Sequence, residues 1–267
     1  MSRCHVLLAT ALVAAVCVSE AARADDTDQA VANPLRGKAH VARDAVRHPA
    51  EELRFFGVRP DATVVEIAPG GGYWTEILSS LLFGAGTYYV ALPGGTDPDD
   101  AREAAAFRAR MDKEPVLYRH IKLTEFGVGH PDIVPPGTAD FVLTFRNLHN
   151  WMEEGDADEV IASFYRALKP GGVLGIEEHR ARADRPQDPK ADNGYVRQDY
   201  ATALIEKAGF KLVASSEMNA NPRDTKDWPR GVWTLPPTFA MGEKDHAKYA
   251  AIGEADNFVL KFVKPAR

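Results

Sequence analysis

The stretch from Val64 to Leu82, which reads VVEIAPGGGYWTEILSSLL, constrains the fold of this chain more than any other. A run of β-branched residues leads into three consecutive glycines, and apolar side chains then recur at helical spacing. This pattern predicts a buried strand, a tight turn and a helix. Glycines allow a ligand to approach the backbone closely, and the first turn of a helix offers unpaired N–H groups. The stretch therefore indicates a turn that holds a nucleotide-like cofactor.

The spacing of the glycines limits which cofactor the turn can hold. A dinucleotide fingerprint, G-x-G-x-x-G, would need a third glycine where Thr75 stands, and no lysine follows the glycines as a P-loop requires. What remains is the order acidic-x-small-x-Gly-x-Gly, which resembles the first motif of class I S-adenosylmethionine (SAM) dependent methyltransferases. The resemblance implies SAM as the cofactor. It also implies the following cofactor-binding residues: Glu66, Ala68 (where the family usually has glycine), Pro69, Gly70, Gly71, Gly72 and Tyr73.

Further segments match this family in the expected order, over residues 64 to 263. A predicted strand, Ala139 to Phe145, ends in the sequence RNLHNW, and a turn reading LKPGG leads into another strand at residues 173 to 177. The run NFVLKFV predicts a closing strand. The chain most closely resembles an exported subgroup of predicted methyltransferases, which implies an α/β fold: a Rossmann-like, doubly wound sheet of seven strands.

Polar side chains follow the fourth and fifth predicted strands. In open α/β sheets, ligands bind beyond the carboxyl ends of the strands, at the switch point. The family's strand order places Arg146, Asn147 and His149 beside the transferred methyl group, and His179 closes the next strand. These four residues are the candidate catalytic residues, with a histidine as the base if the acceptor must lose a proton. The alternative interpretation is that they cap a helix or form a solvated rim.

The predicted second strand, Thr87 to Leu92, departs from the family pattern. Its end usually carries an acidic residue for the ribose hydroxyls, but Leu92 is followed by proline and two glycines. Residues 97 to 100 are better explained as the start of the next helix. The third strand is predicted at Val116 to Leu123, and the resemblance implies that Glu125, just beyond it, lies near the adenine.

Two aromatic residues open the helix after the glycines. Either Tyr73 or Trp74 could contact the positive sulfonium of SAM face-on, an interaction of about 0.5 to 2 kcal/mol. Trp74 begins the apolar spacing of the helix and is assigned to the core, so Tyr73 is the better candidate.

The N-terminus has the features of a signal peptide. Basic residues precede an apolar run from Val6 to Val18, which is followed by Ala22-Arg23-Ala24, and this predicts cleavage after Ala24. The run is too short for a membrane span of about 20 residues, so no stable membrane insertion is expected after cleavage. The predicted organisation is a signal peptide at 1–24, a helical extension at 25–56 and a methyltransferase-like domain at 57–267. The destination is periplasmic or secreted.

Two segments outside the motifs leave alternatives open. Residues 34 to 56 read as one or two arginine-rich helices broken near Pro49, which could cover the cofactor pocket or pack with a solvated arginine face. The aromatic, proline-containing segment 219–253 reads as an ordered loop that either closes over a substrate or merely packs.

Charge and histidine spacing exclude several classes of function. The net charge is −6 and no long basic run is present, so neither nucleic acid nor an anionic membrane is an expected partner. No H-x-x-x-H pair occurs, so no metal site is expected. The sequence leaves the oligomeric state open. It favours a SAM-dependent methyltransferase that acts on a small-molecule acceptor by in-line displacement; the alternative is a non-catalytic exported ligand-binding or scaffold protein that retains the fold.

Overall fold

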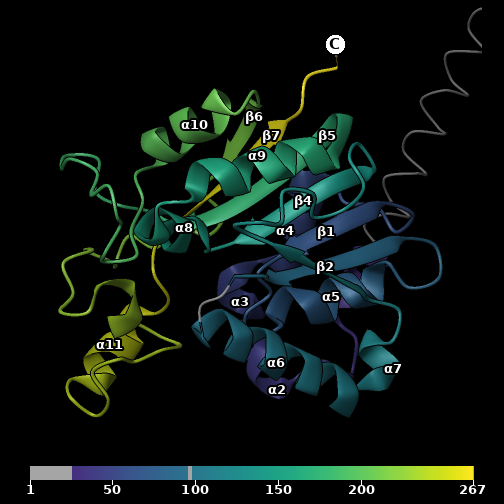
Figure 1. Cartoon of the computed structure of the whole chain (residues 1–267). Helices are drawn as coiled ribbons and strands as arrows, with labels where there is room; N and C mark the ends of the chain where they lie inside the picture. Colours follow the sequence, from purple (N-terminus) through teal and green to yellow (C-terminus); the bar gives the residue numbers. More distant parts are fainter. Residues whose placement is uncertain (1–25, 96–97, 267) are drawn as a thin grey trace, which may run out of the picture.

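The computed structural model describes residues 26–95 and 98–266 of the chain and shows one α/β sheet with helices on both faces (Figure 1). The strands are β1 (Thr63–Ile67), β2 (Thr87–Pro93), β3 (Lys122–Phe126), β4 (Ala139–Phe145), β5 (Leu168–His179), β6 (Lys211–Ser216) and β7 (Asn257–Val263). Their order is β3-β2-β1-β4-β5-β7-β6, and only β7 is antiparallel to its neighbours. This topology confirms the predicted Rossmann-like, seven-stranded fold of the class I methyltransferase type.

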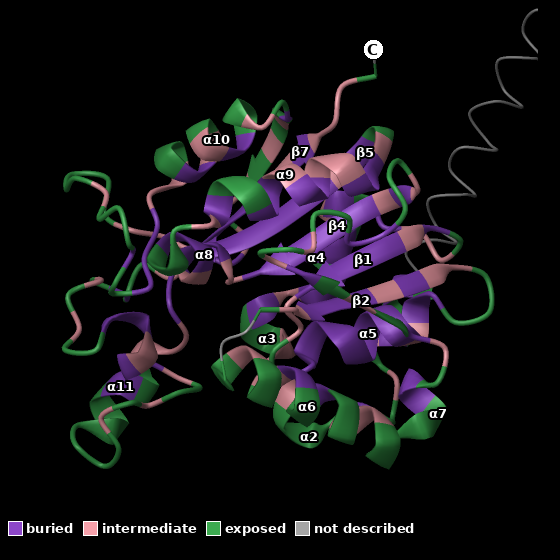
Figure 2. Ribbon diagram, in the orientation of Figure 1, coloured by how far each residue is buried: buried purple, intermediate pink, exposed green. Residues whose placement is uncertain are grey.

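The side chains of β1 alternate between two apolar layers, because successive residues of a strand point to opposite faces. Val65 and Ile67 pack with the layer that includes Phe164 and Ile205, whereas Val64 packs with the opposite layer. The first layer contains α8 (Leu148–Glu154), α9 (Ala157–Ala167) and α10 (Gln198–Lys207); the second contains α4 (Pro49–Phe56), α5 (Tyr73–Leu81), α6 (Pro98–Lys113) and α7 (Pro115–Tyr118). Figure 2 shows the buried strands between these helices, whose outer faces are exposed.

The segment before the sheet forms three short helices rather than the one or two predicted. They are α2 (Lys38–Val41), α3 (Asp44–Arg47) and α4, and residues 26–31 are also helical. The predicted break near Pro49 is confirmed: His48 has a left-handed backbone (φ 43°), and proline occupies the first position of α4. Proline is favoured there because the first helical N–H has no intrahelical partner.

The third strand begins later than predicted. Most of the segment Val116 to Leu123 is the helix α7 and the turn after it, and β3 starts only at Lys122. Pro115 starts α7, and Leu117 and Tyr118 are buried in the second layer, where the carbonyl of Leu117 accepts a hydrogen bond from the Ser79 hydroxyl. Tertiary packing therefore outweighs the strand preference of this apolar run.

The LKPGG segment belongs to the strand, not to a helix cap. Helix α9 ends at Ala167, Leu168 is already extended, and the backbone of Gly171 and Gly172 pairs with Lys264. The glycines thus allow β5 to begin five residues earlier than the predicted Val173, and they do not terminate α9.

The aromatic segment after β6 is packed as a small cluster of its own. Val232, Leu235 and Tyr249 are buried there, with Trp228 and Phe239 against them. Its helices are the 3₁₀ turn η1 (Gly231–Thr234) and α11 (His246–Ile252). Within the described part of the chain, no helix combines the length and apolar character needed to cross a membrane. The predicted signal peptide lies outside the described residues.

Candidate active site

The glycine turn connects β1 to α5 and leaves open space above it. Gly70 has a left-handed backbone (φ 50°), and a Cβ placed on Gly70 or Gly71 would have no heavy atom within 4 Å. Gly72 is also left-handed (φ 82°), a backbone conformation that favours glycine, and it faces Arg110 instead of open space. Gly70 and Gly71 therefore face a space that a ligand can enter.

Two cavities meet at this turn, along the carboxyl edge of the sheet. The first cavity, of about 320 Å³, lies over the ends of β1, β4 and β5. The second, of about 830 Å³, lies over the ends of β2 and β3, between α6 and α8. Ala68, Asn147 and Asn150 line both cavities. The edge is at the left of Figure 1, where α8 and the segment around α11 also lie.

All four candidate catalytic residues line the first cavity. Asn147 Nδ2 lies 3.2 Å from the carbonyl oxygen of Ile67 and 3.3 Å from that of Ala68, so its amide ties the ends of β1 and β4 together. Arg146 Nη1 donates to Glu177 Oε2 at 2.8 Å. The structure thus brings these side chains to the predicted edge, and it gives Arg146 and Asn147 partners within the chain.

The two histidines lie side by side at the base of the first cavity, with ring centroids 5.5 Å apart. His149 Nδ1 is 2.9 Å from Glu178 Oε1, and His179 Nδ1 is 2.7 Å from Asn257 Oδ1. Burial lowers the pKa of His179 to about 4, so this ring is neutral at pH 7. Burial alone would raise the pKa of the Glu178 carboxyl, but its attraction to His149 and its hydrogen bonds hold the value below the ordinary one.

Each imidazole therefore uses Nδ1 for a protein acceptor and keeps Nε2 for the cavity. Among residues 26–95 and 98–266, neither Nε2 makes a hydrogen bond. One ligand atom each from His149, Glu178 and His179 lie within 4.8 Å of one another, a spacing that a divalent metal could bridge. H-x-x-x-H spacing does not reveal this group, because His149 lies in α8 whereas Glu178 and His179 are adjacent at the end of β5. Both Nδ1 atoms and the Glu178 carboxylate are hydrogen-bonded within the described part of the chain, which leaves the two Nε2 atoms as the free ring nitrogens of the group.

Tyr73 is surrounded by arginines. The guanidinium carbons of Arg47, Arg36 and Arg43 lie 4.7, 5.4 and 5.9 Å from its ring centroid. Its hydroxyl donates to Asp44 Oδ1 at 2.7 Å. These arginines would repel another cation. They therefore disfavour the predicted face-on contact between Tyr73 and the sulfonium of SAM. Trp74 stacks on Phe145 with centroids 4.1 Å apart, in agreement with its predicted core role.

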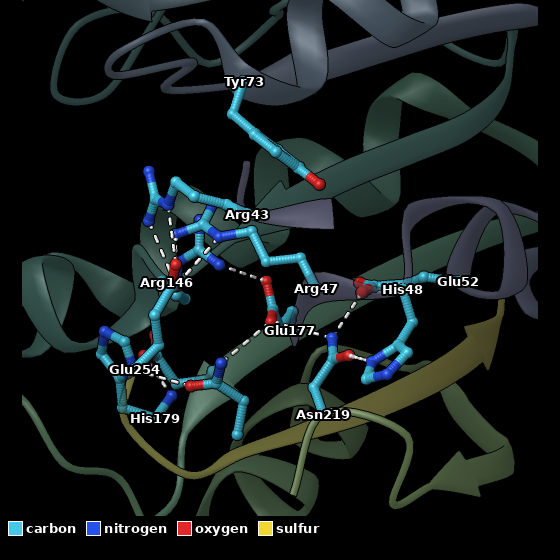
Figure 3. Close-up of polar contacts among 12 residues, drawn as sticks. Arg43, Arg47, His48, Glu52, Tyr73, Arg146, Glu177, His179, Asn219 and Glu254 are labelled. Carbon is cyan, nitrogen blue, oxygen red and sulfur yellow. Dashed lines mark hydrogen bonds and ion pairs between the residues drawn. The ribbon is translucent and has the colours of Figure 1, made fainter. Parts of the chain in front are cut away.

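Arg43 and Arg47 also line the first cavity, where both contact Glu254 (Figure 3). Each arginine approaches this carboxylate to 2.7 Å. The interpretation of a solvated arginine face is therefore wrong for these two side chains. Glu254 was not identified from the sequence, since it lies more than 200 positions from its partners.

Glu66 lies under the glycine turn and is almost completely buried. Its Oε2 accepts hydrogen bonds from the Thr75 hydroxyl at 2.8 Å and from the Tyr88 hydroxyl. Burial raises the pKa of Glu66 to about 7, and the two hydrogen bonds only partly oppose this. Glu66 also lines the first cavity, as do Ala68 and Pro69.

The second cavity combines an apolar wall with carboxylates. Phe126, Val128 and Trp151 line one part, and Asp99, Asp100 and Glu103 of α6 line another. Burial, followed by the charge of Asp100, raises the pKa of the Glu103 carboxyl, and the nearby Gly70 N–H partly opposes this. These acids lie beside the end of β2, where the strand itself carries none. The sequence pattern places Asp99 and Asp100 at the start of a helix, as observed, and gives no indication of Glu103.

Glu125 does not line either cavity. Its carboxylate lies 3.6 Å from Arg108 Nη2 and 3.6 Å from His130 Nδ1. The residue was expected beyond the third strand, but it lies within β3, and the next residue, Phe126, faces the second cavity instead.

Comparison with solved structures finds this fold in proteins of low sequence identity. A SAM-dependent methyltransferase from Aquifex aeolicus is 16% identical, with a TM-score of 0.55 over 84% of this chain and 93% of that chain. The [4+2]-cyclase SpnF is 16% identical, with a TM-score of 0.56 over 91% and 94%. The phosphoethanolamine N-methyltransferase 2 from Haemonchus contortus, in complex with phosphomonomethylethanolamine and S-adenosylhomocysteine, is 15% identical, with a TM-score of 0.56 over 90% and 60%. At this identity the comparisons establish a shared fold.

Neither a model of a known protein family nor the sequence of a curated protein matches this chain.

Proposed function

We propose that this chain binds SAM along the carboxyl edge of its sheet and transfers the methyl group to a small-molecule acceptor. The observation that carries the proposal is the junction of two cavities at an open glycine turn. A cofactor with a nucleoside at one end and an amino acid at the other can extend through both cavities past Ala68, which lines both, and over the open Gly70 and Gly71 of the first. The shared fold of known SAM-dependent methyltransferases supports it.

The second cavity suits the nucleoside. Its apolar wall can cover an adenine ring, and its carboxylates can accept hydrogen bonds from ribose hydroxyls. We assign this accepting role to Glu103, which lines the second cavity and is influenced by the Gly70 N–H. The glycine turn then holds the centre of the cofactor, and Glu66 in its ionised form favours the positively charged end.

The first cavity suits the acceptor. SAM supplies a methyl group that is already activated, so the protein has mainly to align the acceptor and exclude water. His149 is the candidate base, since Glu178 holds its Nδ1–H and leaves Nε2 directed to the cavity. His179 is neutral and orients the acceptor through its own Nε2. Trp233 packs edge-on against His149 and helps to exclude water from this end.

The alternative is an exported binding protein that keeps the fold without the reaction. The absence of an acidic residue at the end of β2 favours this alternative. A similar fold also occurs in SpnF, which is named as a [4+2]-cyclase and not as a methyltransferase. The contact between His149 and Glu178 favours the enzyme, because a buried carboxylate that holds Nδ1–H keeps Nε2 in the form that a general base requires. We therefore favour the enzyme.

Titration of the mature protein with SAM and with S-adenosylhomocysteine tests the proposal, with calorimetry and tryptophan fluorescence as readouts. Both ligands are expected to bind. A Gly70→Val variant should lose this binding, because its side chain would enter the ligand's space and valine disfavours a φ of 50°. The matched variant Gly84→Val, at another left-handed glycine with open space around it but outside the cavities, should keep the affinity. The absence of binding at millimolar ligand overturns the methyltransferase proposal.

We also infer that residues 1–24 direct export and are removed, so that the mature protein is a periplasmic or secreted chain with a helical extension at 25–56 and a methyltransferase-like domain at 57–267. The apolar run and the Ala22-Arg23-Ala24 sequence support this. N-terminal sequencing of the protein from its native cells is expected to begin at Asp25, and a chain that still begins at Met1 contradicts export by cleavage.

A further inference from the structure

Two arginines and one glutamate form a compact charged group on the wall of the first cavity. Arg43 directs Nε to Glu254 Oε1 at 2.7 Å and Nη2 to Glu254 Oε2 at 3.1 Å. Arg47 directs Nε and Nη2 to the same Oε2 at 2.9 and 2.7 Å. One carboxylate therefore holds two guanidinium groups side by side, and one positive charge remains in excess.

The hydrogen-bond donors of this group are not all used. Glu254 takes the Nε and Nη2 edge of both arginines, which leaves both Nη1 atoms. The Arg47 side chain is only 4% exposed. Its Nη1 is buried and has no hydrogen-bond partner in the described part of the chain. Nearly all buried donors in proteins are paired, so an unpaired guanidinium nitrogen in a residue that lines a cavity calls for an acceptor.

The other basic side chains around the cavity and Tyr73 lie beside carboxylates. Arg146 is paired with Glu177 at 2.8 Å, and His40 lies 2.9 Å from Glu76. Arg36 is bound through both terminal nitrogens to Asp44; its buried Nε makes no hydrogen bond within the described residues, but Arg36 does not line the first cavity. Among the described arginines that line the first cavity, the excess positive charge and the buried unpaired donor thus coincide at Arg43 and Arg47.

We propose that Arg43 and Arg47, aligned by Glu254, form a binding site for an acid group, a carboxylate or a phosphoryl group. Guanidinium groups bind such groups through paired N–H donors in a plane. This inference rests on the proposed function and narrows it: either the methyl acceptor is an anion, or the site holds the carboxylate of the amino-acid end of SAM.

Calorimetric titration with inorganic phosphate tests the site without any nucleoside. Arg47→Met is expected to weaken phosphate binding by about tenfold or more, since a charge-assisted hydrogen bond is lost. Glu254→Gln is expected to strengthen it several-fold, because the excess positive charge grows by one. A site that had merely collapsed would lose affinity in both variants, so opposite directions identify the electrostatic role.

Arg36→Met is the matched control. It removes an equally buried guanidinium beside the same tyrosine, one that does not line the cavity, and should leave phosphate affinity unchanged. The proposal is overturned if the wild-type protein does not bind phosphate at tens of millimolar, or if Arg47→Met binds it as tightly as the wild type does.

Two nucleosides then identify the source of the acid group. S-adenosylhomocysteine carries a carboxylate, whereas 5′-methylthioadenosine has the same nucleoside and a thioether but no amino acid. If Arg47→Met weakens only the former, the site holds the cofactor carboxylate. If it weakens neither while phosphate affinity falls, the acid group belongs to the acceptor. A wild-type protein that binds phosphate but neither nucleoside overturns the proposed function and keeps this inference; the reverse result overturns this inference alone.

Discussion

Two residues with strained backbones mark the point where the cavities meet. Ala68 follows β1 with a φ of 48°, and Arg146 follows β4 with a φ of 63°. A left-handed backbone costs a residue other than glycine about 1 to 2 kcal/mol. The Asn147 amide, which bonds the carbonyls of Ile67 and Ala68, stabilises this conformation. Strain that is held in place at a cleft is typical of a functional site, since the backbone is then already arranged for the ligand.

Glu66 gives the site a measurable dependence on pH. Its pKa is about 7 in the folded protein, compared with an ordinary value of 4.5, so between these values the folded chain holds a proton that the unfolded chain has released. Its contribution to stability is therefore fully present below about pH 4.5 and is lost as the pH rises through 7. Relative to Glu66→Gln, the wild type should lose about 3 kcal/mol of unfolding free energy across this range.

Urea unfolding of both proteins at pH 5 and pH 8 measures this difference. Glutamine can still accept hydrogen bonds from Thr75 and Tyr88, so the comparison isolates the titration of the carboxyl group. Stability curves that stay parallel over this range would show that Glu66 titrates normally. Binding of SAM should show the opposite trend and strengthen toward pH 8, where the carboxylate is ionised.

At the scale of elements, most strands could be predicted from the sequence because their apolar runs are short and bounded by glycine or proline. Ala139–Phe145 and Asn257–Val263 lie where their patterns predicted. Val116 to Leu123 is also a short run that contains several apolar residues, yet its first half is helical, because Pro115 starts a turn that Ser79 and the neighbouring helices hold. Composition alone cannot separate a buried strand from a buried helical turn.

The candidate site could be predicted only where it follows the chain locally. Residues 146 to 149 and His179 were found because the ends of parallel strands meet at one edge. Glu103 and Glu254 were missed because neither belongs to a strand end: one projects from the side of α6, and the other precedes β7. Their partners are defined by tertiary packing, which leaves no periodic signal in the sequence.

A buried polar network joins helix α4 to the sheet below the first cavity. Asn219 Nδ2 donates to Glu52 Oε2 at 2.7 Å and to Glu177 Oε1 at 3.0 Å, while His48 Nδ1 lies 3.0 Å from Asn219 Oδ1 (Figure 3). Burial raises the pKa of both glutamates, and the charge of Glu177 raises that of Glu52 further. The amide therefore separates two carboxyl groups that would otherwise face each other in a buried space.

Asn219→Ala should destabilise the protein by about 2 to 4 kcal/mol, because it leaves buried acceptors without their donor. Chemical denaturation measures the loss. In a Glu52→Gln background the same substitution should cost clearly less, since a neutral amide replaces one of the two carboxyl groups; this coupling is the signature of the network. An Asn219→Ala variant within about 0.5 kcal/mol of the wild type would contradict the network's role in attaching α4.

At the scale of the whole molecule, the two cavities are built mainly by different elements of the chain. The second cavity is built by β2, β3, α6 and α8, whereas the wall of the first comes from the N-terminal helices and from residues 232–238 and 254–255. A ligand that extends through both cavities is thus held by groups that share few contacts. Binding contributions from the two cavities should then be close to additive.

Adenosine and S-adenosylhomocysteine together test this division. Adenosine is expected to occupy the second cavity alone, so Glu103→Gln should weaken both ligands by the same factor, about 10- to 100-fold for a lost hydrogen bond to a charged acceptor. Arg47→Met should leave adenosine binding unchanged, since Arg47 lines only the first cavity. The matched control is Glu125→Gln. This carboxylate lies in β3, near the second cavity, but it contacts Arg108 and His130 and does not line the cavity. Equal losses in Glu103→Gln and Glu125→Gln would indicate a general effect of negative charge, and an unchanged adenosine affinity in Glu103→Gln would remove Glu103 from the nucleoside site.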